Sequence, residues 1–171
     1  MPFELRSTIK SGGTLEIMLA EVPIPEAKDN QVVVRIDAAP VNPSDLGLLF
    51  GAADMSTAKI SGSAESAMVM ADIPEAMMKA MAGRLDQSLP VGNEGAGAVV
   101  KAGSSELAQA LMGKTVAVIG GAMYAQYRPV RVDQCLALPE GVTAADGAAW
   151  SVNPTTAQGM AETMRMEGHK H

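Results

Sequence analysis

The first forty residues alternate short apolar stretches with turn signals, which is typical of antiparallel strands. The stretches "FELRSTI", "TLEIMLA" and "QVVVRIDAA" are separated by a Gly-Gly pair and by the polar loop "PIPEAKDN". In the third stretch, Arg35 and Asp37 fall on one side of a two-residue period, whereas Val34 and Ile36 fall on the other. The pattern predicts antiparallel β-structure with one buried face.

The same rhythm returns in the second half in "GAGAVVKAG", "KTVAVIGG", "AMYAQYRPVRV" and "CLALP". Between the first two, "SSELAQALMG" predicts a helical turn that begins at a Ser105 cap and ends at Gly113. Tyr124 and Tyr127 lie three apart on one predicted strand, so their side chains would face opposite sides. Packing is the more ordinary role for both rings.

Three segments have helical patterns. In "VNPSDLGLLFG", Asn42 is a cap candidate, Pro43 takes the first helical position and Asp45 lies in the first turn. The chain then closes with "TAADGAAW" and with "NPTTAQGMAETMRMEG", for which we expect Asn153 as the cap and Gly168 as the end. The last segment has one apolar stripe, made of Ala157, Met160, Ala161 and Met164.

Residues 52–88 have a different character. They begin with a weakly patterned, Ser/Ala-rich stretch and continue into "DIPEAMMKAMAGR", which predicts a helix between Pro74 and Gly83. We interpret the segment as an insertion between core strands. Because long connections usually carry structure or a function, a lid or a partner contact is one possible role.

Composition narrows the class of protein. The chain has 171 residues, of which 47% are hydrophobic and 19% charged, a globular composition that fits one domain. The net charge is -6, and the sequence has no cluster of basic residues. Both observations argue against nucleic acid or an anionic membrane as a partner. The charged start and the single Cys135 lead us to expect a cytoplasmic protein.

A glycine cluster in "LPVGNEGAGAVV" raises the possibility of a phosphate cradle. In a dinucleotide fingerprint, however, the glycines follow a strand and open a helix, so that the helix N-terminus faces the pyrophosphate. Here Gly92, Gly95 and Gly97 precede a Val-rich strand instead. The order favours a glycine-rich bend that leads into a strand.

Four motifs, in order, are "APVNPSDLGLLFG", "LPVGNEGAGAVVKAG", "GKTVAVIGGAMYAQY" and "ALPEGVTAADGAAWSVNPTTAQGM". Together they resemble the N-terminal half of the medium-chain dehydrogenase/reductase superfamily, most closely its zinc-free quinone reductase and enoyl-thioester reductase branches. The resemblance implies a mostly β fold with helices (α+β), a GroES-like, partly open barrel that joins a Rossmann domain. It also implies hydride transfer from NADPH or NADH to a quinone or an α,β-unsaturated carbonyl.

By resemblance, Asn42 and Thr156 match positions beside the nicotinamide, and Asn153 is carried over with them. Each also has an ordinary alternative, because Asn42 and Asn153 could simply cap helices and Thr156 could be a first-turn residue. Enoyl-thioester reductases of this type place a tyrosine soon after the first motif, and this chain has none there. That difference favours a quinone or enone reductase.

Zinc-dependent members carry a histidine where this chain has Asn93, and a cysteine where it has Pro43 or Ser44. The remaining soft or imidazole donors are Cys135, His169 and His171, which do not form a tetrahedral site. We therefore expect no catalytic zinc.

We divide the chain into a substrate domain at 1–149, with its insertion at 52–88, and a connecting helix at 150–171. No segment has the strand, glycine-rich turn and helix of a cofactor domain. We therefore expect the substrate-side part of an oxidoreductase, inactive alone, whose exposed apolar end favours a homo-oligomer. The alternative is a stand-alone barrel that binds a ligand or partner without catalysis.

Overall fold

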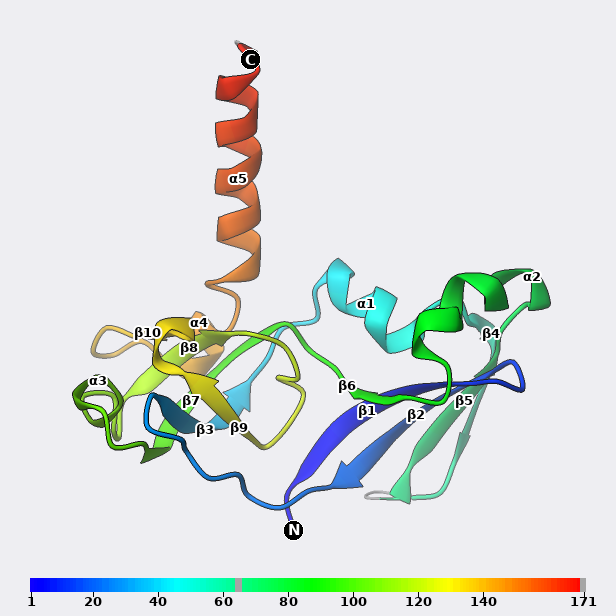
Figure 1. The fold of residues 1–171 in the computed structure, drawn as a ribbon, viewed down its shortest axis with the longest axis horizontal. Helices are drawn as coiled ribbons and strands as arrows, with labels where there is room; N and C mark the ends of the chain where they lie inside the picture. The colour runs from blue at the N-terminus through cyan, green and yellow to red at the C-terminus, as the bar shows by residue number, and fades with distance from the viewer. Residues whose placement is uncertain (64–65, 170–171) are drawn as a thin grey trace. The chain divides into compact units, whose positions relative to one another are not determined.

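The computed structural model describes residues 1–63 and 66–169 and divides into two compact units (Figure 1). The first unit comprises Met1–Pro25, Val41–Asn93 and Gly121–Arg128. The second comprises Glu26–Pro40, Glu94–Gly120 and Pro129–His171. Each unit is built around one sheet, so the mixed, mostly β fold expected from the sequence is confirmed.

The first sheet has five strands in the order β4-β5-β2-β1-β6, and neighbouring strands pair antiparallel (Figure 1). Its strands are β1 (Phe3–Lys10), β2 (Thr14–Glu21), β4 (Asp54–Ser61), β5 (Met68–Asp72) and β6 (Ser88–Pro90). Buried Ile9, Leu15 and Ile17 form the centre of the core on one face. The alternation in the first two sequence stretches thus predicted β1 and β2 correctly.

The predicted insertion at 52–88 contributes β4, β5 and the first residue of β6. β5 pairs with β2, and β6 pairs with β1, so the segment forms part of the sheet. Its predicted helix begins after Pro74 as α2 (Glu75–Met78) and continues as the 3₁₀ helix η2 (Lys79–Arg84). The Arg84 guanidinium donates to the carbonyl of Leu48 at 2.8 Å and to the Ser7 hydroxyl at 3.0 Å, which fastens η2 to the end of α1 (Pro43–Phe50).

The second sheet has the order β10-β8-β7-β3-β9 (Figure 1). Its strands are β3 (Gln31–Ala38), β7 (Glu94–Ala102), β8 (Thr115–Ile119), β9 (Tyr127–Arg131) and β10 (Cys135–Ala137). Arg35 and Asp37 are exposed, whereas Val34 is fully buried and Ile36 half-buried, as the period-two pattern predicts. Val33 has the same parity as Arg35 but is also fully buried, so the first half of β3 is buried on both faces. At Gly97 the backbones of β7 and β3 approach so closely that no side chain fits.

Helices α3 (Glu106–Gln109), α4 (Ala144–Gly147) and α5 (Val152–Met166) complete the second unit, together with the 3₁₀ helix η3 (Val132–Gln134). Ser105 caps α3 as expected, with its hydroxyl accepting from the Ala108 amide at 3.2 Å. From Asn153 onward, every described residue of α5 is exposed. Trp150, Met160 and Met164 are 40%, 65% and 44% exposed, respectively.

Tyr124 does not share a strand with Tyr127, so this prediction was wrong. β9 begins only at Tyr127, and Tyr124 lies in a bend before it. The physical reason is an irregular stretch between the two tyrosines: the chain bends at Tyr124 and again at Gln126, and Ala125 makes only an isolated bridge to Glu4. The period-two argument holds only within a continuous strand.

Candidate functional site

The start of α1 is held by a pair of reciprocal hydrogen bonds. The Asn42 amide donates to the Asp45 carboxylate at 2.8 Å, and the Asp45 amide donates to the Asn42 carbonyl at 2.9 Å. Asn42 has extended backbone angles and is 3% exposed, while Asp45 is 1% exposed. The predicted N-cap position of Asn42 is therefore correct, and its backbone is fixed by both bonds while the residue is buried.

A second segment of the first unit contacts this helix start. The Asn93 side-chain amide donates to the Ser44 hydroxyl at 3.0 Å. The preceding residue, Gly92, has φ +97, and a Cβ there would lie 2.7 Å from the Tyr124 ring and backbone nitrogen. Gly92 thus allows the chain to pass close to Tyr124. A strand follows as the sequence predicts, but it begins earlier than expected: β7 starts at Glu94, so Gly95 and Gly97 lie within the strand and not in a bend before it.

Tyr124 adds a titratable group to this region. Burial raises the pKa of its hydroxyl to about 12, and a hydrogen bond and the negative charge of Asp45 add to the effect. The neutral hydroxyl is thus favoured at physiological pH. Asn42, Ser44, Asn93 and Tyr124 together provide neutral amide and hydroxyl groups within one unit.

The start of α5 is organised differently. Glu94, the first residue of β7, is fully buried, and its carboxylate accepts from the amides of Ser151 at 2.9 Å and Val152 at 2.8 Å. The helix N-cap is Ser151, so the expectation that Asn153 caps this helix was wrong. Asn153 is the second residue of the helix. The helix can begin earlier than predicted because Glu94 accepts hydrogen bonds from the backbone amides of Ser151 and Val152.

Asn153 and Thr156 lie three apart on the first turns of α5, and both are exposed. Residues at this spacing are neighbours on one helix face. The Thr156 hydroxyl donates to the Val152 carbonyl at 2.7 Å, which fixes the direction in which its oxygen lone pairs point. The second unit therefore brings two of the predicted site residues together, whereas Asn42 lies in the first.

The positions compared with zinc ligands hold no set of donors that suits a metal. Asn93 and Ser44 are hydrogen-bonded to each other. Among the described residues, no group of three or more His, Cys, Asp or Glu side chains could hold an ion. His169 pairs with Glu167 at 3.3 Å, and His171 lies outside the described residues.

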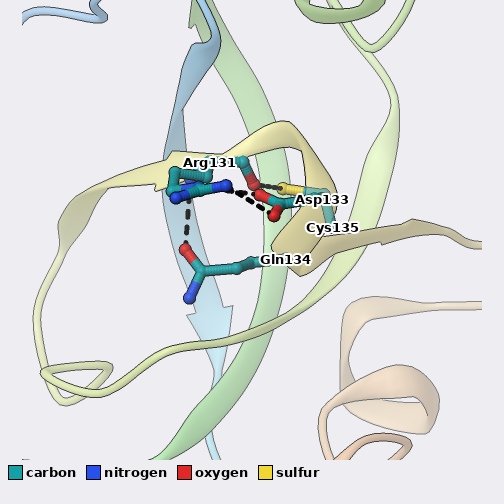
Figure 2. A network of polar contacts seen from close by, with 4 residues as sticks. All are labelled: Arg131, Asp133, Gln134 and Cys135. Carbon is teal, nitrogen blue, oxygen red and sulfur yellow. Dashed lines mark hydrogen bonds and ion pairs between the residues drawn. The ribbon is translucent and has the colours of Figure 1, made fainter.

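Cys135 belongs to a separate polar network (Figure 2). The Arg131 guanidinium binds both carboxylate oxygens of Asp133 at 2.9 and 2.8 Å, and the thiol donates to the Arg131 carbonyl at 3.3 Å. Burial, followed by the Asp133 charge, raises the pKa of the Cys135 thiol to about 11. Because the thiolate is the reactive form, this cysteine is a poor nucleophile.

Two hollows border that network. One of about 580 Å³ is lined by Arg131 and by residues 28–31, and one of about 280 Å³ lies between α3 and the β10 side of the network. Their described linings contain none of Asn42, Asn153 and Thr156. The network is best explained as a structural corner between β9 and β10.

Sequence reasoning missed two residues of the candidate site. Glu94 stands between glycines and an apolar strand, and a charge in that setting indicates a buried carboxylate that needs partners. Tyr124 gave no comparable signal, because its neighbours Asp45 and Gly92 lie far from it in the sequence.

We compared the chain with known proteins. No protein-family model matches it. A chloroplastic quinone-oxidoreductase homolog from Spinacia oleracea is 29% identical over 150 residues, which cover 85% of this chain and 37% of the relative. The chain therefore spans less than half of that relative's length.

Solved structures show the same fold. A candidate NADPH:quinone reductase from Mesorhizobium loti aligns with a TM-score of 0.64 at 22% identity, covering 98% of this chain and 45% of that one. A mycobacterial protein solved in complex with NADPH aligns with a TM-score of 0.63 at 14% identity, covering 95% and 40%.

None of the helices in the described part of the chain has the length and apolar character that crossing a membrane requires. The four motifs, the relative from spinach and the shared fold agree with one another. By sequence the chain is similar to a quinone-oxidoreductase homolog, and by fold it is similar to solved quinone reductases.

Proposed function

We propose that this chain is the substrate-side part of a zinc-independent, NADPH-dependent oxidoreductase that reduces quinones or α,β-unsaturated carbonyls. The observation that carries the proposal is the 29% identity to a quinone-oxidoreductase homolog over 85% of the chain. The NADPH complex of a protein with the same fold supports the choice of cofactor.

The donors in the chain suit a nicotinamide and a carbonyl substrate. NADPH supplies a hydride to the electrophilic carbon when it is bound. Asn42, Asn153 and Thr156 would hold the nicotinamide side of the cofactor, since amides and hydroxyls can pair with a neutral carboxamide. The Asn42 side-chain amide would also donate toward the substrate oxygen, where negative charge develops in the transition state. The Thr156 hydroxyl gives its hydrogen to the Val152 carbonyl, so its oxygen would act as an acceptor beside the reacting atoms, for the amide hydrogens of the nicotinamide carboxamide.

Zinc has no role in this proposal. A catalytic zinc needs three protein ligands from histidine, cysteine or carboxylate side chains. Asn93 and Ser44 are weak ligands, and they are hydrogen-bonded to each other at 3.0 Å. Stabilisation of the substrate oxygen would therefore come from hydrogen-bond donors.

The cofactor's pyrophosphate would be held by sequence beyond the described elements. The glycine cluster leads into β7 and not into a helix, so it lacks the arrangement that binds a pyrophosphate. The chain alone would therefore be inactive. Exposed Trp150, Met160 and Met164 support an assembly larger than a monomer. A cytoplasmic location stays a prediction, since the relative from spinach is chloroplastic.

The test is NADPH oxidation by the full-length product of the gene that encodes this chain, measured with a panel of quinones and enones. We expect turnover with at least one of them. In Thr156→Val, kcat/KM should fall about tenfold through loss of one hydroxyl. Thr163→Val is the matched control, because this exposed threonine on α5 makes the same bond to the carbonyl four residues earlier, at 2.9 Å.

Activity that is absent, or equal losses in the two threonine variants, would contradict the proposal. Binding of a quinone without any NADPH-dependent turnover would favour the alternative of a non-catalytic binding module.

A further inference from the structure

Glu94 is a fully buried carboxylate whose place in the fold calls for an explanation. Burying a charged group is costly unless hydrogen bonds or an opposite charge compensate for the lost water. Here the carboxylate accepts from two backbone amides, those of Ser151 at 2.9 Å and Val152 at 2.8 Å. Both belong to the start of α5, 57 and 58 residues further along the chain.

Glu94 has the role that an N-cap side chain usually has. The first amides of a helix have no partner within the helix, and Ser151 makes no side-chain cap bond here. α5 is 15 residues long, and its aligned peptide dipoles place partial positive charge at this end. The carboxylate of Glu94, the first residue of β7, thus binds the start of the helix through hydrogen bonds and through its negative charge.

Side-chain burial does little to fix the beginning of α5. All described residues from Asn153 onward are exposed, so side-chain burial contributes little to the position of the first turn. Asn153 lies on that turn, and Thr156 lies on the next one. Their place relative to the sheet therefore depends strongly on the bonds made by Glu94.

We propose that Glu94 is a positioning residue, which holds the first turn of α5 so that Asn153 and Thr156 face the nicotinamide. The part that names the nicotinamide rests on the proposed function. Glu94 itself touches neither cofactor nor substrate. It acts through the two amides that it binds.

The first experiment measures the contact without any activity. Amide hydrogen exchange is followed residue by residue in the full-length product of the gene and in its Glu94→Ala and Glu94→Gln variants. Glu94→Ala should speed exchange at Ser151 and Val152 about tenfold or more, because both amides lose their acceptor. Glu94→Gln keeps one carbonyl oxygen and should give an intermediate rate.

Glu106→Gln is the matched control, because Glu106 is an exposed carboxylate in the first turn of α3 in the same unit. It should leave exchange at Ser151 and Val152 unchanged. Equal exchange of these two amides in the wild type and in Glu94→Ala would overturn the inference, whatever the enzyme activity.

The second experiment separates positioning from stability. A lower folded fraction reduces apparent kcat but leaves KM unchanged. We expect Glu94→Ala to raise the KM for NADPH about fivefold, with a smaller rise in Glu94→Gln and a KM for the quinone within about twofold of wild type. Faster exchange with an unchanged KM for NADPH would overturn the positioning role. A wild type that never oxidises NADPH would refute the proposed function, and the exchange result would then decide by itself whether Glu94 fixes α5.

Discussion

The contact at Gly97 allows a quantitative test of the second sheet. An ideal Cβ at this position would lie 1.8 Å from the carbonyl oxygen of Arg35, 2.7 Å from its carbonyl carbon and 2.9 Å from the Ile36 Cα. All three atoms belong to the backbone of β3, which pairs with β7 at the centre of the sheet. No rotamer change relieves such an overlap, so Gly97→Ala must displace one of the two strands.

We expect Gly97→Ala to lower the free energy of unfolding by about 2–3 kcal/mol, in the upper part of the range for overpacked sites. For a protein of this size, that corresponds to a fall in Tm of about 4–12 °C. Gly159→Ala is the control, because Gly159 is an exposed residue of α5 with no atom within 4 Å of its Cβ position. Alanine there should favour the helix by about 1 kcal/mol.

The assay is thermal and urea denaturation followed by far-ultraviolet circular dichroism and by the fluorescence of Trp150, which reports on the second unit. A Gly97→Ala protein whose Tm stays within about 2 °C of wild type would refute the close approach of the strands, since a Cβ cannot occupy that space without a cost.

Two further predictions concern titratable groups. In Tyr127→Phe, where Tyr124 is the remaining tyrosine, absorbance at high pH should titrate near 12. The raised pKa favours the neutral hydroxyl, so its stabilising effect should be complete below pH 10 and lost as the pH rises through 12. Asp45→Asn should lower this midpoint only in part, because burial is the larger cause; an unchanged midpoint would exclude the hydrogen bond. Cys135 should react with a thiol reagent at pH 8 about a hundredfold more slowly in the folded protein than in the unfolded chain. Asp133→Asn should raise the reaction rate of the folded protein modestly, because the Asp133 charge is the smaller cause of the raised pKa. A rate equal to that of unfolded chain would contradict its burial.

Where the local sequence pattern and the tertiary environment agree, the sequence alone was sufficient to predict the secondary structure. The valines of β3 and β8 and the Ser105 cap of α3 appear in the structure as predicted. Strands β4 and β5 were not predicted. β4 is mostly exposed and poor in β-branched residues, and it forms by pairing with β5, which in turn pairs with β2. Such pairing is a non-local property that a Ser/Ala-rich segment does not reveal.

The candidate site shows the same division. The N-cap position of Asn42 could be predicted, because the Pro43 and Asp45 that accompany it are local signals. The start of α5 could not be predicted, since its cap is supplied by Glu94 from 57 residues away. The roles of Asn42, Asn153 and Thr156 came from the family resemblance, and they remain predictions.

The most direct test of the central claim is the path of the hydride. The full-length product of the gene is incubated with an α,β-unsaturated ketone and with NADPH that carries deuterium at the transferable position of nicotinamide C4, and the reduced ketone is analysed by mass spectrometry and NMR. Our account predicts one deuterium on the β-carbon, with a lower yield in Thr156→Val. NADPH oxidation that leaves no deuterium in the reduced ketone would contradict it.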